Sequence, residues 1–290
     1  LLPLYINDGW EHVEFQFPDL TNNIAEAREK AASHLYVNAQ RLLREGGKIE
    51  AREAFSELIQ LNRLYRNYKD TNELMAIAEE KGVSKVAFDI KNNTRINLPE
   101  EFNNQLSSID FHQLNNQWLN FYSNGTTETD YNIELVIQSI DVGPNALDKD
   151  VNILEKEISD GFHYVLDENG NVMQDSLGND IKEERFIVVN CKVKEFRQFK
   201  VANISGTVHF IDKQSDRVLG RFPVSADAIF ENYYATALGD IRALDKRTKR
   251  LLEHEPVPYP HDVELLAQSG ETLKPVVKEV IWDHKALVMN

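Results

Sequence analysis

The chain has very little cysteine: Cys191 is the single one among 290 residues. A disulfide framework and a cysteine-based zinc site each need several cysteines, so the sequence excludes both. Long hydrophobic runs are also missing, and without a stretch of about 18 apolar residues no membrane-spanning helix is predicted. Basic residues are outnumbered, with 32 Lys and Arg against 47 Asp and Glu and a formal net charge of -15. Such a surface repels phosphate backbones, so we expect no nucleic-acid partner.

Glycine-rich catalytic and nucleotide-binding motifs are absent as well. The sequence contains no G-x-S-x-G, no P-loop and no G-x-G-x-x-G, which are the signatures of a hydrolase nucleophile, a phosphate cradle and a dinucleotide turn. Cys191 lies in a predicted buried strand, where a thiol is more often a packing group than a nucleophile. We therefore predict no catalytic residue and no cofactor.

The best metal candidate is the segment DENGNVMQDSLGND, in which Asp167, Asn169 and Asn171 place oxygen side chains at alternate positions. A calcium loop uses such spacing, but it also needs glycine at the sixth position and glutamate at the twelfth. Here Gly170 is fourth and Gly178 is twelfth. The pattern therefore favours an exposed hairpin over a calcium site.

Three histidines near the C-terminus form a second metal candidate together with one acid, Asp262. His254, His261 and His284 match no H-E-x-x-H spacing, and the prolines of EPVPYPHD (255–262) keep the local path extended. We therefore predict no metal site.

The N-terminal part of the chain divides into an arm and a helical domain. Residues 1–23 mix aromatics and acids without a clear period, which predicts an extended arm anchored by Trp10, Phe15 and Phe17. Apolar residues then recur at steps of three or four, which predicts two antiparallel helices separated by glycines and a third helix. Asp70 and Glu73 are spaced as a capping box for that third helix. The helical domain covers residues 24–82.

Within the first helix pair, the large and small residues follow the spacing of a tetratricopeptide repeat. Small Ala39 and Ala51 would let the two helices approach closely, whereas Arg63 stands where the repeat usually has proline. An ordinary helical hairpin is the alternative interpretation. The matching residues are Leu35, Ala39, Leu42, Ala51, Phe55 and Leu58.

Residues 83–290 carry mainly strand patterns. VSKVAFDI, WLNFY and YNIELVIQSI predict strands, and further strands are predicted at 186–196, 202–210 and 218–228, with DKQSD (212–216) as a turn. The ENGN and LGND turns predict a projecting hairpin near 163–185. Helices are expected over 241–252 and along a final segment that Pro275 kinks or divides. The predicted fold class is α+β, a tetratricopeptide-like helical hairpin followed by an α/β sandwich with a largely antiparallel sheet.

Aromatic residues supply the candidate partner-binding sites. The segment FENYYATALGD (230–240) places Tyr233 and Tyr234 beside small residues, which fits a recognition edge and fits ordinary core equally well. The same two interpretations hold for Trp10, Phe15 and Phe17.

Four segments together resemble a family of tetratricopeptide-containing cell-envelope lipoproteins of Bacteroidetes. They are YKDTNELMAIAEEKGVSKVAF, ELVIQSIDVGPN, VLDENGNVMQDSLGNDIK and FENYYATALGDIRALDKRTKRLLEHEPVPYPHD. The resemblance implies a lipid-anchored cysteine ahead of Leu1, a place in the periplasm or at the outer membrane, and no known catalysis. The strand at Val86 and its following helix are more loosely similar to curli-secretion and penicillin-binding-protein activator lipoproteins.

These observations favour a non-enzymatic accessory or scaffold lipoprotein of a bacterial envelope assembly. Its expected partners are other envelope proteins in a membrane-protein complex, and its membrane contact would be the lipid anchor. One alternative is a carbohydrate-binding module that uses Tyr233, Tyr234 and Trp118 as platforms. The other is a glycan- or peptide-acting enzyme, with carboxylates meeting in a cleft of the sheet; they would be Asp89, Glu134 and Asp141.

Overall fold

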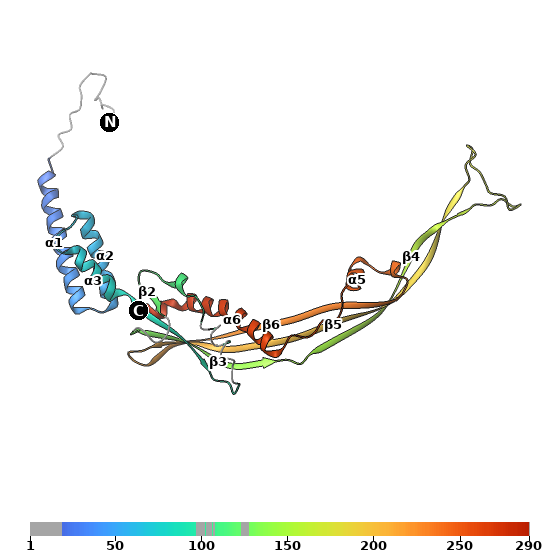
Figure 1. Cartoon of the computed structure of the whole chain (residues 1–290). Coiled ribbons are helices and arrows are strands. Elements are labelled where there is room, and N and C mark those ends of the chain that lie inside the picture. Colours follow the sequence, from blue (N-terminus) through green and yellow to red (C-terminus); the bar gives the residue numbers. More distant parts are fainter. Residues whose placement is uncertain (1–18, 97–101, 103–105, 107, 123–127, 290) are drawn as a thin grey trace, which may run out of the picture.

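The computed structural model of the chain describes residues 19–96, 102, 106, 108–122 and 128–289. It confirms a mixed α+β fold with a mostly antiparallel sheet. Figure 1 shows a helical unit at one end and a long curved sheet that extends away from it. The helices of the described residues are α1 (Thr21–Glu45), α2 (Lys48–Leu64), α3 (Thr71–Gly82), α5 (Lys246–Leu251) and α6 (Asp262–His284).

The helical unit has its own apolar core. Helix α1 packs on α2, and α2 packs on α3, as the helical spacing of the apolar residues predicts. Ala39 and Ala51 are both fully buried, so small side chains occupy the helix contacts. The core consists of Ala32, Tyr36, Ala39, Leu42, Ala54, Leu58, Leu61 and Ala78. Because α1 begins at Thr21, it includes the last three residues of the predicted arm, 1–23. Residues 1–18, with Trp10, Phe15 and Phe17, lie outside the described residues.

The start of α3 is where the sequence predicts it, but the predicted capping box is wrong. Asp70 precedes the helix and makes no side-chain cap. Its carboxylate instead accepts a hydrogen bond of 2.6 Å from the hydroxyl of Tyr36 on α1. This hydrogen bond, together with burial, raises the pKa of Tyr36 to about 12. The aspartate is thus used to join two helices and is not available to cap one.

One sheet carries all the strands. Its order is β2-β1-β3-β5-β4, with β6 on the free side of β5. Strands β1 (Ser84–Asn92), β2 (Leu119–Tyr122) and β3 (Tyr131–Val142) run parallel to one another. Strands β4 (Ala146–Tyr164), β5 (Lys182–Asp212) and β6 (Arg217–Gly239) join the sheet by antiparallel pairing.

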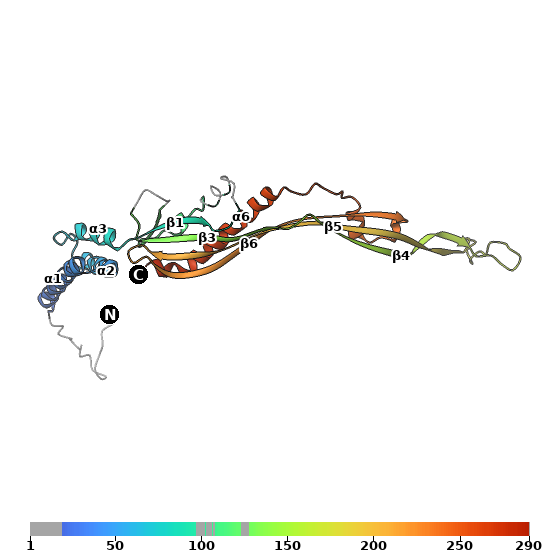
Figure 2. The same ribbon diagram turned by 90° about the horizontal axis from the view of Figure 1, so that it is seen from below.

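Strand β5 determines the elongated shape. It is 31 residues long, and the predicted strands at 186–196 and 202–210 are two parts of it. Residues 202–212 pair with β3, whereas residues 182–199 pair with β4 on the same edge. The sheet therefore continues past the end of β3 as a ribbon, which Figure 2 shows from below. From here on, the arm means β4, residues 182–199 of β5 and residues 230–239 of β6, and not the predicted N-terminal segment 1–23. Residues 165–181 are called the tip.

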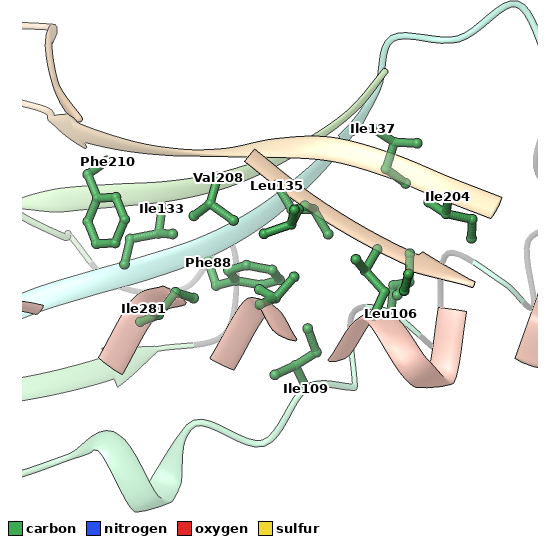
Figure 3. Close-up of a cluster of buried hydrophobic side chains, with 14 of the residues drawn as sticks. Phe88, Leu106, Ile109, Ile133, Leu135, Ile137, Ile204, Val208, Phe210 and Ile281 are labelled. Carbon is green, nitrogen blue, oxygen red and sulfur yellow. The ribbon is translucent and has the colours of Figure 1, made fainter. Parts of the chain in front are cut away.

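The main core lies between the sheet and α6. Inward side chains of β1, β3 and β5 meet one face of α6 (Figure 3). Residues two apart on a strand share a face, so alternate positions of these strands are apolar. The fully buried members from the strands and α6 are Val86, Leu119, Ile133, Leu135, Ile137, Ile204, Val208, Phe210, Leu273, Val277 and Ile281.

A second core lies on the opposite face of the same strand. In the arm the buried β5 residues are Val189, Cys191 and Val193, at odd positions, whereas the main core uses Ile204 and Val208, at even positions. The pairing with β6 is regular between these two regions. The buried side chains of β5 therefore move from one face of the sheet to the other. We call these faces the odd face and the even face, after the numbers of the β5 residues that project from them. Helix α5 and the preceding turn cover the arm's odd face, and α6 covers the even face near the helical unit.

The segment between α5 and α6 crosses the edge of β6 to connect these two faces. The ring Nδ1 of His254 lies 3.0 Å from the main-chain oxygen of Tyr233 on β6. Beyond this point Gln198 exchanges two hydrogen bonds with the main chain of Val257. The buried ammonium of Lys200 donates to the main-chain oxygen of Pro260 and is paired with Asp262. We call residues 253–261 the strap.

Two predicted helix features need correction. The helix expected at 241–252 begins only at Lys246, because Asp245 accepts a hydrogen bond from the main-chain N–H of Thr248 and caps it there. The final helix is one undivided element with Pro275 inside it. Helix α3 ends at Gly82, as predicted, and β1 begins at Ser84.

Arg52 of α2 joins the helical unit to the sheet. Its guanidinium donates to the main-chain oxygen of Gly82 at 2.8 Å, to Ser84 Oγ at 3.0 Å and to the main-chain oxygen of Met289. The ring of Trp118 lies beneath the guanidinium and also contacts Phe55 of α2. Burial lowers the pKa of Arg52. One side chain thus connects α2, the end of α3, β1 and the C-terminal segment.

Candidate functional site

The arm presents an uncovered sheet face. Its odd face carries α5, but the even face opposite it holds exposed apolar side chains from all three strands. Leu238 leaves 78% of its surface exposed, Ile153 66% and Val188 65%. In register Lys192 stands between Ile153 and Leu238, so a charged side chain separates these two apolar groups across the sheet. The exposed apolar residues of this open face include Val151, Ile153, Phe186, Val188 and Leu238.

Charged side chains are interspersed with this apolar surface. Lys192 and Lys194 lie on β5, and Glu155 and Glu157 lie on β4. All four are exposed. Apolar side chains are enriched in the cores of protein contact sites, so this mixed apolar and charged face is the candidate contact site.

The tip consists of two copies of one tight turn. Asp175 follows Asp167 by eight residues, and the sequences DENGN and DSLGN share the aspartate, the glycine and the final asparagine. Asp167 accepts hydrogen bonds from the main-chain N–H groups of Asn169 and Asn171 at 2.9 and 2.8 Å. The second turn repeats this pattern at 2.9 Å in both bonds, with Asp175 as acceptor. Glycine is required in each, because φ is +85° in the first turn and +86° in the second.

The two turns are closed on each other by the main chain. Three positions eight residues apart, Val165, Met173 and Ile181, form a ring of hydrogen bonds. The N–H of Met173 donates to Val165, that of Ile181 donates to Met173 and that of Val165 donates to Ile181, at 2.8 to 3.0 Å. The tip is therefore a hydrogen-bonded unit, and it holds Leu177 with 85% of its surface exposed.

The aspartate carboxylates of the tip accept hydrogen bonds from the turns to which they belong. Hydrogen bonds from Asn171 lower the pKa of Asp167, and those from Asn179 lower the pKa of Asp175. Both oxygens of each carboxylate accept from main-chain or asparagine N–H groups of the same turn. These contacts favour the hairpin interpretation of the segment.

The candidate tyrosines lie on opposite faces of the arm. Tyr234 stacks on Phe196 at 4.7 Å between ring centroids, on the even face. Tyr233 is its neighbour in sequence and therefore projects from the odd face. Trp118 lies at the contact with the helical unit, against Phe55. The structure does not bring the three proposed sugar platforms together.

The structure brings two of the three candidate carboxylates side by side and leaves the third apart. Asp89 and Glu134 are register neighbours on β1 and β3. Glu134 forms an ion pair of 2.7 Å with Lys91, and this hydrogen bond raises the pKa of the lysine. Asp141 lies seven residues farther along β3, where it accepts a hydrogen bond from Ser139. The arrangement gives Glu134 a structural partner and places Asp141 elsewhere.

The histidines of the C-terminal segment have separate structural roles. His254 contacts β6, His261 precedes α6, and His284 at the end of that helix stacks on Phe222 at 3.6 Å. Helix α6 has 23 residues, which separates its two ends by roughly 33 Å at about 1.5 Å per residue. Among the described residues no group of three or more His, Cys, Asp or Glu side chains is arranged to hold a metal ion.

The sequence interpretation missed the open face of the arm. β4 is exposed along most of its length, so it lacks the alternation that identifies a half-buried strand. The eight-residue repeat of DENGN and DSLGN was the sequence signal for a long hairpin at this place, because two equal turns in succession extend a hairpin.

No protein-family model matches the chain, and no curated protein matches it. No helix in the described part of the chain is long and apolar enough to cross a membrane.

Proposed function

We propose that the protein is a non-catalytic accessory or scaffold component of a protein assembly in the bacterial cell envelope. The observation that carries this proposal is the open face of the arm, where Ile153, Val188 and Leu238 are all exposed on the same side of the sheet. Leaving such groups in water costs about 25 cal/mol per Å² of apolar surface that a partner could cover. The arm therefore gains free energy when another protein packs on it.

The shape of the arm supports the same function. Residues 182–199 of β5 number 18, which corresponds to roughly 60 Å of strand at about 3.3 Å per residue. An element of this reach presents the tip far from the main core (Figure 1). We infer that the arm and the tip together contact the partner, while α6 and the main core keep the arm in place.

The cell-envelope part of the proposal rests on sequence resemblance. The segments that resemble Bacteroidetes envelope lipoproteins include α3, the tip and the strap. A lipid-anchored cysteine ahead of Leu1 and a place in the periplasm or at the outer membrane are proposed on the same basis. The partners are then other envelope proteins, in particular a membrane-protein complex.

The tetratricopeptide-like hairpin and the α/β sandwich remain part of this proposal. What supports the first is the complete burial of Ala39 and Ala51, which occupy the small positions of the repeat. What supports the second is α6, which packs on the sheet across the main core. A helical hairpin of this type would supply a second protein contact surface.

Purification of the tagged full-length protein from its native membranes, followed by quantitative mass spectrometry, tests the proposal. Wild type is compared with Val188→Glu and Leu238→Glu, which place charges on the open face. Ile77→Glu on the exposed surface of α3 is the matched control. We expect a stoichiometric partner with wild type and with the control, and its loss with both arm variants. Recovery of free monomer from wild type, or equal recovery of the partner from all four, would contradict the proposal.

A further inference from the structure

A cavity of about 580 Å³ lies beside β1, at the opposite end of the sheet from the tip. Strand β2 pairs only with Ser84–Ala87 of β1, so the next residues, Phe88 to Ile90, have β3 on one side and the cavity on the other. The last two residues of β2 form another wall. The volume is in the range of small-ligand sites, about 300–1,000 Å³.

Aromatic rings make up the apolar part of this cavity. Phe111 stacks on Phe121 with 5.1 Å between centroids and 18° between planes. It also contacts Phe88 at 4.7 Å. Tyr122 completes the aromatic set among the lining residues. Aromatic faces carry negative electrostatic potential and attract cations at short range.

Two carboxylates line the same cavity. Asp89 accepts a hydrogen bond from the N–H of Ile90 at 2.9 Å, and Asp110 accepts one from the N–H of His112 at 2.9 Å. Among the described residues, no lysine or arginine forms an ion pair with either carboxylate. Lys91 forms its ion pair with Glu134 on the adjacent strand and also interacts electrostatically with Asp89. The lining therefore carries two carboxylates, and the Lys274 ammonium lies 3.3 Å from Ser108 Oγ at its wall.

We infer that this cavity binds an organic cation, an alkylammonium or guanidinium group on an apolar stem. The stem would pack against the Phe111 and Phe121 rings, and the charge would meet Asp89 and Asp110. Such a group exists in free small amines and in the lysine and arginine side chains of proteins. The inference is independent of the arm, because the cavity and the open face lie in different parts of the sheet.

Calorimetric titration of the full chain with matched probes tests the inference. Phenethylammonium is compared with 2-phenylethanol, its neutral counterpart, and a blocked peptide with a central lysine is compared with the same peptide carrying norleucine. We expect a dissociation constant of about 1 mM or tighter for at least one cationic probe, and at least roughly tenfold weaker binding of its neutral counterpart. Saturation by phenethylammonium alone assigns the site to small amines, whereas tighter binding of the lysine peptide assigns it to a protein side chain.

Carboxylate variants show where the probe binds. Asp89→Asn and Asp110→Asn keep the oxygen that accepts each main-chain N–H, so the fold is retained. Each should weaken cation binding roughly three- to tenfold, without changing the affinity for 2-phenylethanol. Asp141→Asn, an exposed carboxylate outside the cavity, is the control and should bind as wild type does. The inference is overturned by equal binding of charged and neutral probes, by unchanged binding in both cavity variants, or by no saturation up to about 10 mM.

Discussion

Arg52 offers the sharpest test of how the helical unit is held to the sheet. Its guanidinium donates to Gly82, Ser84 and Met289 at once, and these acceptors belong to three different segments. A hydrogen bond to a charged group contributes about 1.5–3 kcal/mol, but water replaces part of each bond when the arginine is removed. We therefore expect Arg52→Met to lower the free energy of unfolding by about 3 kcal/mol.

The companion variant Arg52→Lys separates charge from geometry. Lysine keeps the positive charge but has a single ammonium in place of the planar guanidinium, so it cannot reach all three acceptors. We expect a loss of about 2 kcal/mol. Arg41→Met is the control, because Arg41 is exposed on α1 and its change should stay within about 0.5 kcal/mol.

Urea unfolding followed by circular dichroism measures these differences, and hydrogen exchange locates them. Protection should fall first at the α2 and β1 amides near Arg52, while amides of the arm stay protected. If Arg52→Lys is as stable as wild type within about 0.5 kcal/mol, the three-way guanidinium contact is not what joins the two parts.

Three further results are expected. Tyr36→Phe should lower the free energy of unfolding by about 1 kcal/mol, because the hydrogen bond to Asp70 is lost. In the wild type the raised pKa of Tyr36 means that the free energy of unfolding declines as pH rises from 10.0 toward about 12, and unfolding measured at graded pH checks this. Asp167→Ala should disorder the first tip turn without changing the midpoint of global unfolding. In the wild type the lowered pKa of Asp167 keeps the turn formed until pH falls below the usual carboxyl range. Amide NMR signals of the tip monitor both effects. Gly206→Ala should destabilise the main core by more than about 2 kcal/mol in thermal unfolding, because its Cβ would stand 2.5 Å from the main-chain oxygen of Val136.

Elements with a buried face were predictable from the sequence. The apolar periods of α1 and α2 and the alternation in β3 follow from burial on one side, and the structure confirms these elements. The order of the elements from helices to sheet was likewise apparent, because α3 is followed at once by a β-branched and aromatic run.

The arm could not be predicted in the same way. β4 has almost no buried residue, so its sequence is free to be polar and carries no period. Within β5 the buried positions change from odd to even beyond Val193, and a periodic pattern that changes phase looks like two strands. The capping box failed for a different reason, because the partner of Asp70 is Tyr36, which lies 34 residues earlier.

The candidate site was predictable only in its parts. The turns of the tip and the aromatic segment with Tyr233 and Tyr234 were identified, but the pleat that places these two rings on opposite faces depends on the strand conformation. The open face and the cavity beside β1 each combine side chains that are distant in sequence and become neighbours through strand register.

Strand β5 belongs to both cores, and this has a mechanical consequence. A load applied at the tip along the arm would be carried by one continuous backbone to the α6 end of the molecule. The interstrand hydrogen bonds lie across that direction, so they would share the load in shear and would have to break together instead of opening one by one. The strap, fastened near Lys200, would resist peeling of β6 at the point where the burial changes face. Tension applied between its two ends would therefore stretch the molecule little.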